Sequence, residues 1–209
     1  MAWLRVVPAM IGFGLFALGG VLSLGAALGT FFARLRGHPL TIPRALSLGV
    51  SIVFVTIAAR GSNDPAINDF TTDPDDPPAF VHAGSFPANA GRDLGYPVEF
   101  ASIQHECCAD LRGSLFDAPP AGAFPRVLAV ARSMPTWEIT FTDPAAGVIE
   151  AVATTLVFGF QDDIAIRVRP VPQGGSRVDL RSKSRDGRGD IGANAARIRA
   201  FVHELEKRG

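Results

Sequence analysis

The first 59 residues of the chain contain no acidic residue and only four basic residues, all of them arginine. No charged residue of either sign occurs from Val6 to Ala33. Because a bilayer is crossed by roughly 20 apolar residues, this uncharged stretch predicts a membrane-spanning helix. A cleaved signal peptide is the alternative, although the stretch is longer than the usual apolar core of such a peptide.

A second stretch, from Leu40 to Ala59, contains one charged residue, Arg44. This arginine is close enough to the end of the stretch for its side chain to reach the lipid headgroups. The loop of residues 34–44 holds three arginines and no acidic residue. Short basic loops remain in the cytoplasm, so the sequence predicts a two-pass transmembrane hairpin over residues 1–60 in the inner membrane, with the C-terminal domain in the periplasm.

Small residues recur in both stretches, at Gly25 and Gly29 in the first and at Ala45, Gly49 and Ser51 in the second. Such residues let two helix backbones approach closely, although they are common in membrane spans of any packing. The spacing therefore allows a helix contact at these positions without requiring one.

Sequence motifs of the common enzyme classes are absent. The chain has no G-x-S-x-G elbow, H-E-x-x-H helix, P-loop or dinucleotide fingerprint. The sequence therefore gives no motif-based support for assigning the chain to the hydrolases, metalloproteases or nucleotide enzymes that carry these motifs. We expect no cofactor, and binding or scaffolding is favoured over catalysis.

Cysteine is nearly absent, since Cys107 and Cys108 are the only two. With His105 and Asp110 they carry metal-binding atoms, but no second Cys or His pair stands at zinc-ligand spacing. The acidic residues 73–76 lack the spacing of a calcium loop, so no metal site is predicted. Outside the cytoplasm the two cysteines either oxidise to a vicinal bridge or remain buried thiols.

The polar part of the chain divides by composition. Residues 61–95 are rich in Pro, Asp, Asn and Thr without a helix or strand period, which predicts an extended strap or linker. Residues 61–150 hold 13 acidic and four basic groups, whereas residues 151–209 hold seven acidic and 11 basic groups. Acidic residues interrupt the basic ones in the second half, which argues against a nucleic-acid partner. Four apolar anchors favour a strap that lies on a folded surface: Ile67, Phe70, Phe80 and Phe86.

The hydrophobic pattern of residues 96–209 predicts an α+β domain outside the membrane, with the order β-α-β-β-β-β-α. Helices are expected from Pro119 to before Pro135 and from Asp190 to about Lys207, each with one apolar face. Short connections between successive strands require antiparallel neighbours, so we expect an antiparallel sheet with the helices on one face. The predicted strands are residues 113–118, 136–143, 148–160, 162–171 and 176–185.

Alternation along the first of the longer strands places Trp137, Ile139 and Phe141 on one side. On the last strand, Arg181 and Arg185 fall on the face opposite Val178 and Leu180. Charged residues that alternate in this way favour ion pairs across neighbouring strands. We predict structural ion pairs or a helix cap for three acidic residues: Asp162, Asp163 and Asp190.

Three segments resemble a known family: "INDFTTDPDDPPAF", "FGFQDDIAIRVRP" and "DLRSKSRDGRGDIGANAARIRAF". Together they are similar to the domain-of-unknown-function family 1499, bacterial and plastid proteins whose membrane-attached members carry a similar hairpin. The resemblance runs from Ile67 to the C-terminus and implies no established activity. Members carry an aromatic residue and a proline after a Gln-x-Glu segment, whereas this chain reads "QHECCADL", so Cys107 and Cys108 match no family motif.

A candidate anion or ligand site lies at the junction between the last strand and the last helix. Gly187 and Gly189 let the backbone approach an anion at the start of the helix, although Asp190 competes for the same donors. A structural corner is the alternative interpretation. Seven residues form the candidate set: Arg181, Ser182, Ser184, Arg185, Arg188, Asn194 and Arg197.

Three further hypotheses accompany the binding or scaffolding module. One is a carrier that encloses a lipid or another apolar ligand between helix and sheet, with aromatic side chains as its lining. Another is an enzyme of unrecognised type that uses Asp163 and Arg181. The third is an accessory subunit whose hairpin docks on a membrane-protein partner. The carrier would use Trp137, Phe141, Phe158, Phe160 and Phe201.

Overall fold

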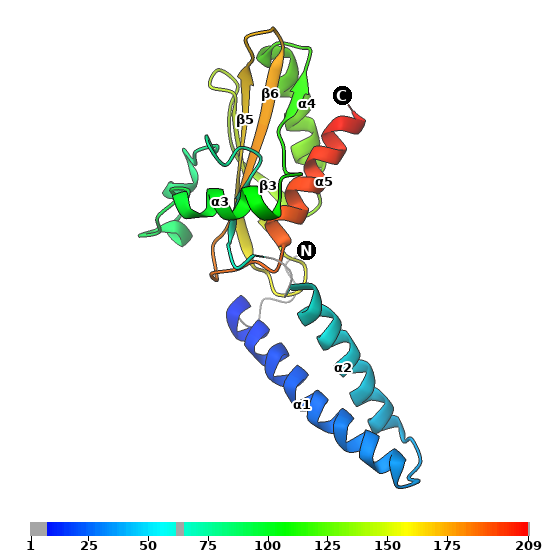
Figure 1. Ribbon diagram of the computed structural model, residues 1–209. Helices are drawn as coiled ribbons and strands as arrows, with labels where there is room; N and C mark the ends of the chain where they lie inside the picture. The colour runs from blue at the N-terminus through cyan, green and yellow to red at the C-terminus, as the bar shows by residue number, and fades with distance from the viewer. Residues whose placement is uncertain (1–7, 62–64, 209) are drawn as a thin grey trace. The chain divides into compact units, whose positions relative to one another are not determined.

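The computed structural model describes residues 8–61 and 65–208 (Figure 1). The chain divides into two compact units, residues 1–64 and residues 65–209. Residues 65–95, for which the sequence indicated a strap or linker, belong to the second unit. The predicted hairpin and strap also include residues 1–7 and 62–64, which lie outside the described residues.

The first unit is a helical hairpin of α1 (Ala9–Leu35) and α2 (Ile42–Gly61). The first helix ends where Gly37 adopts a left-handed conformation and donates its N–H to the Arg34 carbonyl. Among the described residues, α1 alone is long and apolar enough to cross a membrane, and α2 contributes a shorter apolar stretch, Ile42–Thr56. An N-terminal anchor is thus supported by α1, whereas the second span stays a prediction.

The two helices touch through polar and aromatic side chains. Ser51 Oγ donates to Ser23 Oγ at 3.1 Å, and the ring of Phe54 lies against Gly20, where a Cβ atom would find no room. Of the small residues that allowed a helix contact, Ser51 makes one, whereas the three glycines at positions 25, 29 and 49 do not. Nothing lies within 4 Å of the Cβ position at Gly25, Gly29 or Gly49.

The second unit is built on one antiparallel sheet, as predicted. The strands follow the order β1-β6-β5-β4-β3, and β2 pairs with β6 beside β1. The short strand β1 lies in the predicted strap. The strands are β1 (Asp69–Thr71), β2 (Ser114–Phe116), β3 (Trp137–Asp143), β4 (Val148–Thr154), β5 (Gln161–Pro170) and β6 (Ser176–Ser184).

Helices α4 (Pro120–Ser133) and α5 (Ala193–Lys207) cover one face of the sheet (Figure 1). Between them and the sheet lie fully buried branched side chains such as Ile164, Ile166 and Ile198. Burying each such side chain stabilises the fold by roughly 1.5–3 kcal/mol. The core of the domain is therefore on this face, as the alternation of β5 and β6 predicted.

Segment 72–97 covers part of the opposite face and includes the 3-10 helices η1 (Ala83–Ser85) and η2 (Pro87–Asn89). It leads into α3 (Val98–Cys107), which the sequence did not predict. The carboxamide of Gln104 bonds both the N–H and the carbonyl of Thr71, so α3 continues the hydrogen bonding of β1. The predicted strap is thus a folded cover.

The predicted strand of residues 148–160 is too long. Strand β4 ends at Thr154, and a turn follows in which Thr155 N–H donates to the Phe160 carbonyl at 2.8 Å. Gly159 closes this turn with φ of 73°. The strand prediction is too long because residues 148–160 are mostly apolar and rich in β-branched side chains throughout. In the turn, Leu156 and Val157 are exposed to solvent.

Strand β3 contains a bulge that moves Phe141 to the other face. The register with β4 shifts between Ile139 and Phe141, so Thr140 is the extra residue. Trp137 and Ile139 pack against the core, whereas Phe141 stacks on His82 with ring centroids 5.2 Å apart. The prediction that all three apolar residues share one side is therefore wrong for Phe141.

Cys107 and Cys108 form a disulfide at the end of α3, which answers the alternative left open by the sequence. We predict that a maleimide does not label the denatured chain until a reductant is added. Denaturation removes protection by burial, so labelling of the unreduced, denatured chain would instead indicate free thiols. A Gln173→Cys variant, exposed on the β5–β6 turn, serves as the positive control.

Candidate functional site

The sheet face under segment 72–97 is charged and nevertheless buried. Asp163, Asp179, Arg181 and Lys183 project from β5 and β6 on this face and have little contact with solvent. A buried charge is tolerated only when it is paired and hydrogen-bonded. The arrangement of partners therefore determines what these groups can do.

Asp69 forms the centre of the most deeply buried ion-pair group. Its carboxylate is 0% exposed and accepts from Arg181 Nε at 2.9 Å and Nη2 at 2.7 Å, a bidentate pair. Lys183 Nζ donates to the same carboxylate at 2.9 Å. The two basic residues project from β6 and Asp69 projects from β1. The ion pairs therefore connect the first strand of the domain to the last.

Segment 72–97 completes the surroundings of Arg181. Its guanidinium donates to the Leu94 carbonyl at 2.9 Å and to the Pro78 carbonyl at 3.3 Å. The guanidinium carbon also lies 4.7 Å from the centre of the Phe80 ring and 5.4 Å from that of Tyr96. Burial, reinforced by the nearby Asp69 carboxylate, raises the pKa of Tyr96 well above its ordinary value. These contacts of the Arg181 side chain are therefore all with groups of the domain itself.

Asp163 organises a second buried group. Arg185 binds its carboxylate with Nη2 at 2.6 Å and Nε at 3.1 Å. Asn89 and Arg92, both from the covering segment, reach the other carboxylate oxygen at 3.0 Å and 3.3 Å. Sequence reasoning missed these two partners because nothing in their local pattern indicates contact with β5.

A third charged group lies farther along the same face. Arg169 binds Asp73 and Asp76 at 2.7 Å each, and Arg177 Nε lies 2.8 Å from Asp179. Arg167 also contacts all three carboxylates, at 3.2–3.5 Å. The hydrogen bond from Arg167 holds the pKa of Asp76 below its ordinary value. The acidic residues of the strap thus neutralise arginines of the sheet.

Glu150 is buried on this face and has a different kind of partner. Its carboxylate accepts the backbone N–H groups of Val81, His82 and Ala83, the latter two at 3.0 Å and 2.7 Å. These donors stand at the start of η1, where N–H groups lack helical partners. Glu150 therefore fixes the covering segment to β4, a role that the sequence did not indicate.

The helix face of β6 carries a separate polar network. Arg197 Nη2 binds Asp162 at 2.6 Å, and its Nη1 donates to Ser182 Oγ at 3.0 Å and Asn194 Oδ1 at 2.7 Å. Asn194 Nδ2 in turn donates to Ser184 Oγ at 2.8 Å. This network ties α5 to the end of β6.

Asp190 accepts the backbone N–H of Gly192 at 3.0 Å and of Asn194 at 2.6 Å, so its carboxylate occupies donors at the start of α5. Burial raises the pKa of Asp190 above its ordinary value despite these bonds. Asp190 therefore binds N–H groups in the first turn of α5, although Gly192 is the N-cap residue. Asp162 pairs with Arg197 and not with an arginine of β6.

The seven candidate ligand-binding residues do not surround one point. Arg181 on β6 and Arg185 just after its end lie on the covered face, whereas Ser182 and Ser184 point to the helix face with Asn194 and Arg197. Arg188 is exposed on the loop. Anion binding at this junction stays a prediction, and the geometry described above provides it with no convergent set of unpaired donors.

The suspected metal ligands are also dispersed. His105 lies 3.1 Å from Asp75, Asp110 pairs with Arg199 at 2.6 Å, and the two cysteines are bonded to each other. The hydrogen bond from Arg199 lowers the pKa of Asp110. Within residues 8–61 and 65–208, no group of three or more His, Cys, Asp or Glu side chains is placed to hold a metal ion.

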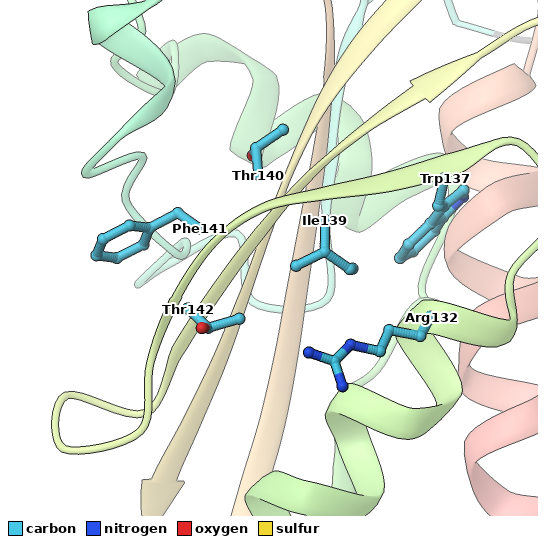
Figure 2. A pocket seen from close by; sticks show the side chains of 6 residues that line it. All are labelled: Arg132, Trp137, Ile139, Thr140, Phe141 and Thr142. Carbon is cyan, nitrogen blue, oxygen red and sulfur yellow. The ribbon is translucent and has the colours of Figure 1, made fainter.

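The outer edge of β3 provides the candidate binding site. An open groove of about 600 Å³ follows the strand from Trp137 to Thr142, with Arg132 of α4 beside it (Figure 2). In the described part of the chain, β3 pairs with β4 on one side and with no strand on the other. Thr140 Oγ1, at the bulge, is buried without a hydrogen-bond partner among those residues. The groove thus combines an open strand edge with apolar and cationic side chains.

Replacement of Arg181 tests the structural role of the charged face. We predict that Arg181→Met lowers the free energy of unfolding by about 3–5 kcal/mol, because Asp69 loses its bidentate partner while remaining buried. Arg188→Met, on the exposed loop, should change it by less than about 0.5 kcal/mol. Denaturant unfolding followed by tryptophan fluorescence gives both values, and equal stability of the two variants would contradict the assigned role.

Comparison with known proteins assigns a family but no activity. No curated protein matches the chain. The profile of the family described as "Protein of unknown function (DUF1499)" matches residues 69–205. This range contains the six strands of the described sheet, α4, all but the last two residues of α5, and the buried ion pairs. The chain therefore belongs to the DUF1499 family.

Proposed function

We propose that the protein is a membrane-anchored binding module that takes an extended segment of a partner protein at the outer edge of β3. The open groove beside this strand is the observation that carries the proposal. An edge strand presents unpaired backbone N–H and carbonyl groups, and an added strand satisfies them. Backbone pairing supplies affinity in such complexes, while side-chain pockets supply specificity.

The side chains along the groove favour a partner segment with apolar residues and an acidic group. Trp137 and Ile139 form its apolar surface on the helix face, and Arg132 projects beside them (Figure 2). The bulge at Thr140 interrupts the regular edge, which restricts pairing to a short segment and opposes edge-to-edge aggregation. A small ligand with an anionic and an apolar part is compatible with the same groove.

The carrier hypothesis receives less support from the arrangement of its aromatic residues. Trp137 stacks on Phe201 within the core, with ring centroids 5.5 Å apart, whereas Phe141 lies on the opposite face. Phe158 and Phe160 belong to the β4–β5 turn and its end. These five side chains do not line one cavity between helix and sheet.

The enzyme hypothesis relied on Asp163 and Arg181. Both side chains are buried, and both bind internal groups of the domain. Their contacts account for them as structural residues. The DUF1499 description names no reaction that would give them another role.

The anchor in this proposal is the two-pass hairpin, with α1 as its principal span. Loop 34–44 lies in the cytoplasm, and the DUF1499 domain lies in the periplasm, where a membrane-protein partner is accessible to it. The positive loop supports this orientation. The Cys107–Cys108 disulfide also favours an oxidising compartment.

A reporter fusion tests the orientation. We expect alkaline phosphatase fused after Gly209 to be active, because that enzyme needs the periplasm to form its disulfides. A fusion after Gly37, in the loop, should be inactive. Activity only in the loop fusion would reverse the topology, and activity in both would indicate a single span.

Strand addition at β3 is tested with the full chain in lipid nanodiscs. The probes are apolar peptides of about ten residues with an acidic end, taken from a random library and measured by fluorescence polarisation. We expect N-methylation of alternate backbone amides to abolish binding, because it removes the donors that pair with the strand edge. Retained binding by the methylated peptides would contradict strand addition.

Arg132 gives a matched pair of variants for the same measurement. Arg132→Glu should weaken binding of acidic peptides about fivefold, which is the usual size of an exposed charge interaction. Arg112→Glu changes the same charge away from the groove and should leave the affinity unchanged. Equal effects of both variants would show that only the overall charge matters.

A further inference from the structure

One end of the folded domain carries apolar side chains that the core does not use. Leu156 and Val157, at the tip of the β4–β5 turn, are 90% and 83% exposed. Ile191, in the loop between β6 and α5, is 50% exposed. Scattered apolar residues are ordinary on a protein surface. Adjacent exposed apolar residues at the tip of a turn indicate a contact surface instead.

The turn and the loop lie at the same end of the sheet. Strand β5 starts at Gln161, whose carbonyl accepts the N–H of Arg185 at 3.0 Å, just after the end of β6. Residues of the β6–α5 loop therefore lie beside the β4–β5 turn. The β5–β6 turn, residues 171–175, is at the opposite end of the sheet (Figure 1).

The domain also begins at this end. Asn68 accepts the N–H of Ser184 at 2.8 Å and donates its Nδ2 to the Gly187 carbonyl at 2.6 Å. Only residues 62–64 separate Pro65 from Gly61, the last residue of α2, so four Cα–Cα steps, about 14 Å at most, connect the two positions. The covalent chain thus limits the distance between Pro65 and the end of α2, whatever the arrangement of the two units.

The backbone at Ile191 gives an independent observation. Its φ is 53°, in the left-handed region that a β-branched residue rarely adopts. Glycine or asparagine would fit this conformation with less strain. The apolar side chain at this position therefore carries a cost in backbone strain. Strain of this kind often occurs where a side chain has a function outside the fold.

We infer that this end of the domain is a membrane-contacting surface, in which Leu156 and Val157 insert among the lipid headgroups and Ile191 lies beside them. The inference rests on the proposed anchor, because that anchor places α2 at the bilayer. Asp186 and Arg188 are exposed on the same loop with opposite charges. The contact is therefore apolar and nearly independent of ionic strength, in contrast to binding by a basic patch.

Environment-sensitive labels test the contact in the full chain. The native cysteines are bonded to each other, so one introduced thiol can be labelled without a reductant. A nitrobenzoxadiazole label is placed at Val157→Cys and, for the matched control, at Gln173→Cys on the opposite turn. The chain is held in phosphatidylcholine nanodiscs with or without lipids that carry a doxyl quencher near the headgroup.

We expect the label at position 157 to emit at a shorter wavelength than at position 173 and to be quenched by the doxyl lipids. Adding Leu156→Asp should reduce this quenching at least twofold, and high salt should not. Equal emission and no quenching at both positions, with the chain retained in the discs, would overturn the inference and leave the anchor intact.

Two other outcomes have distinct meanings. A short emission wavelength at position 157 without quenching would show that protein, a second copy or a partner, covers the tip, and it would overturn the assignment to lipid. Failure of the chain to remain with the discs would overturn the proposed anchor and, with it, this inference.

Discussion

The bidentate pairing of Asp69 with Arg181 is the constraint on which the charged face of the domain depends. Removing either ion from water costs several kcal/mol, and only a partner of opposite charge with good geometry offsets that cost. The two residues are 112 positions apart in the chain. The pair can exclude water only after β1 and the covering segment are in place, so the segment that resembles a linker is required for a stable sheet.

The sheet consequently has two covers of different chemistry. Helices α4 and α5 bury an apolar face, where packing contributes most of the stability. The opposite face buries arginines and carboxylates, which pair with one another between the strap and the strands. Since these charged groups bind one another, the chemistry available to a partner lies elsewhere, on the groove beside β3 and at the β4–β5 turn.

These two surfaces are the ones that the proposed partner binding and the proposed membrane contact would use. The open edge of β3 offers backbone hydrogen bonds, which require an extended partner of modest sequence specificity. Family membership is consistent with this reading and adds no reaction to it, because the DUF1499 description contains none.

The sequence by itself determined the uncharged N-terminal stretch, the antiparallel order of the longer strands, and the separation of Ile164 and Ile166 from the charged side chains of β5. The first is a matter of composition, the second follows from the short connections between successive strands, and the third follows from side-chain alternation along a strand. All three are local properties of the chain. Tertiary structure alone decided that Asp162 binds Arg197 and not an arginine of β6, that Thr140 forms a bulge, and that β4 ends at Thr154. The partner of a buried charge is whichever oppositely charged group the fold places within reach. A bulge or a turn depends on the neighbouring strand. The local sequence of one segment therefore specifies none of these features.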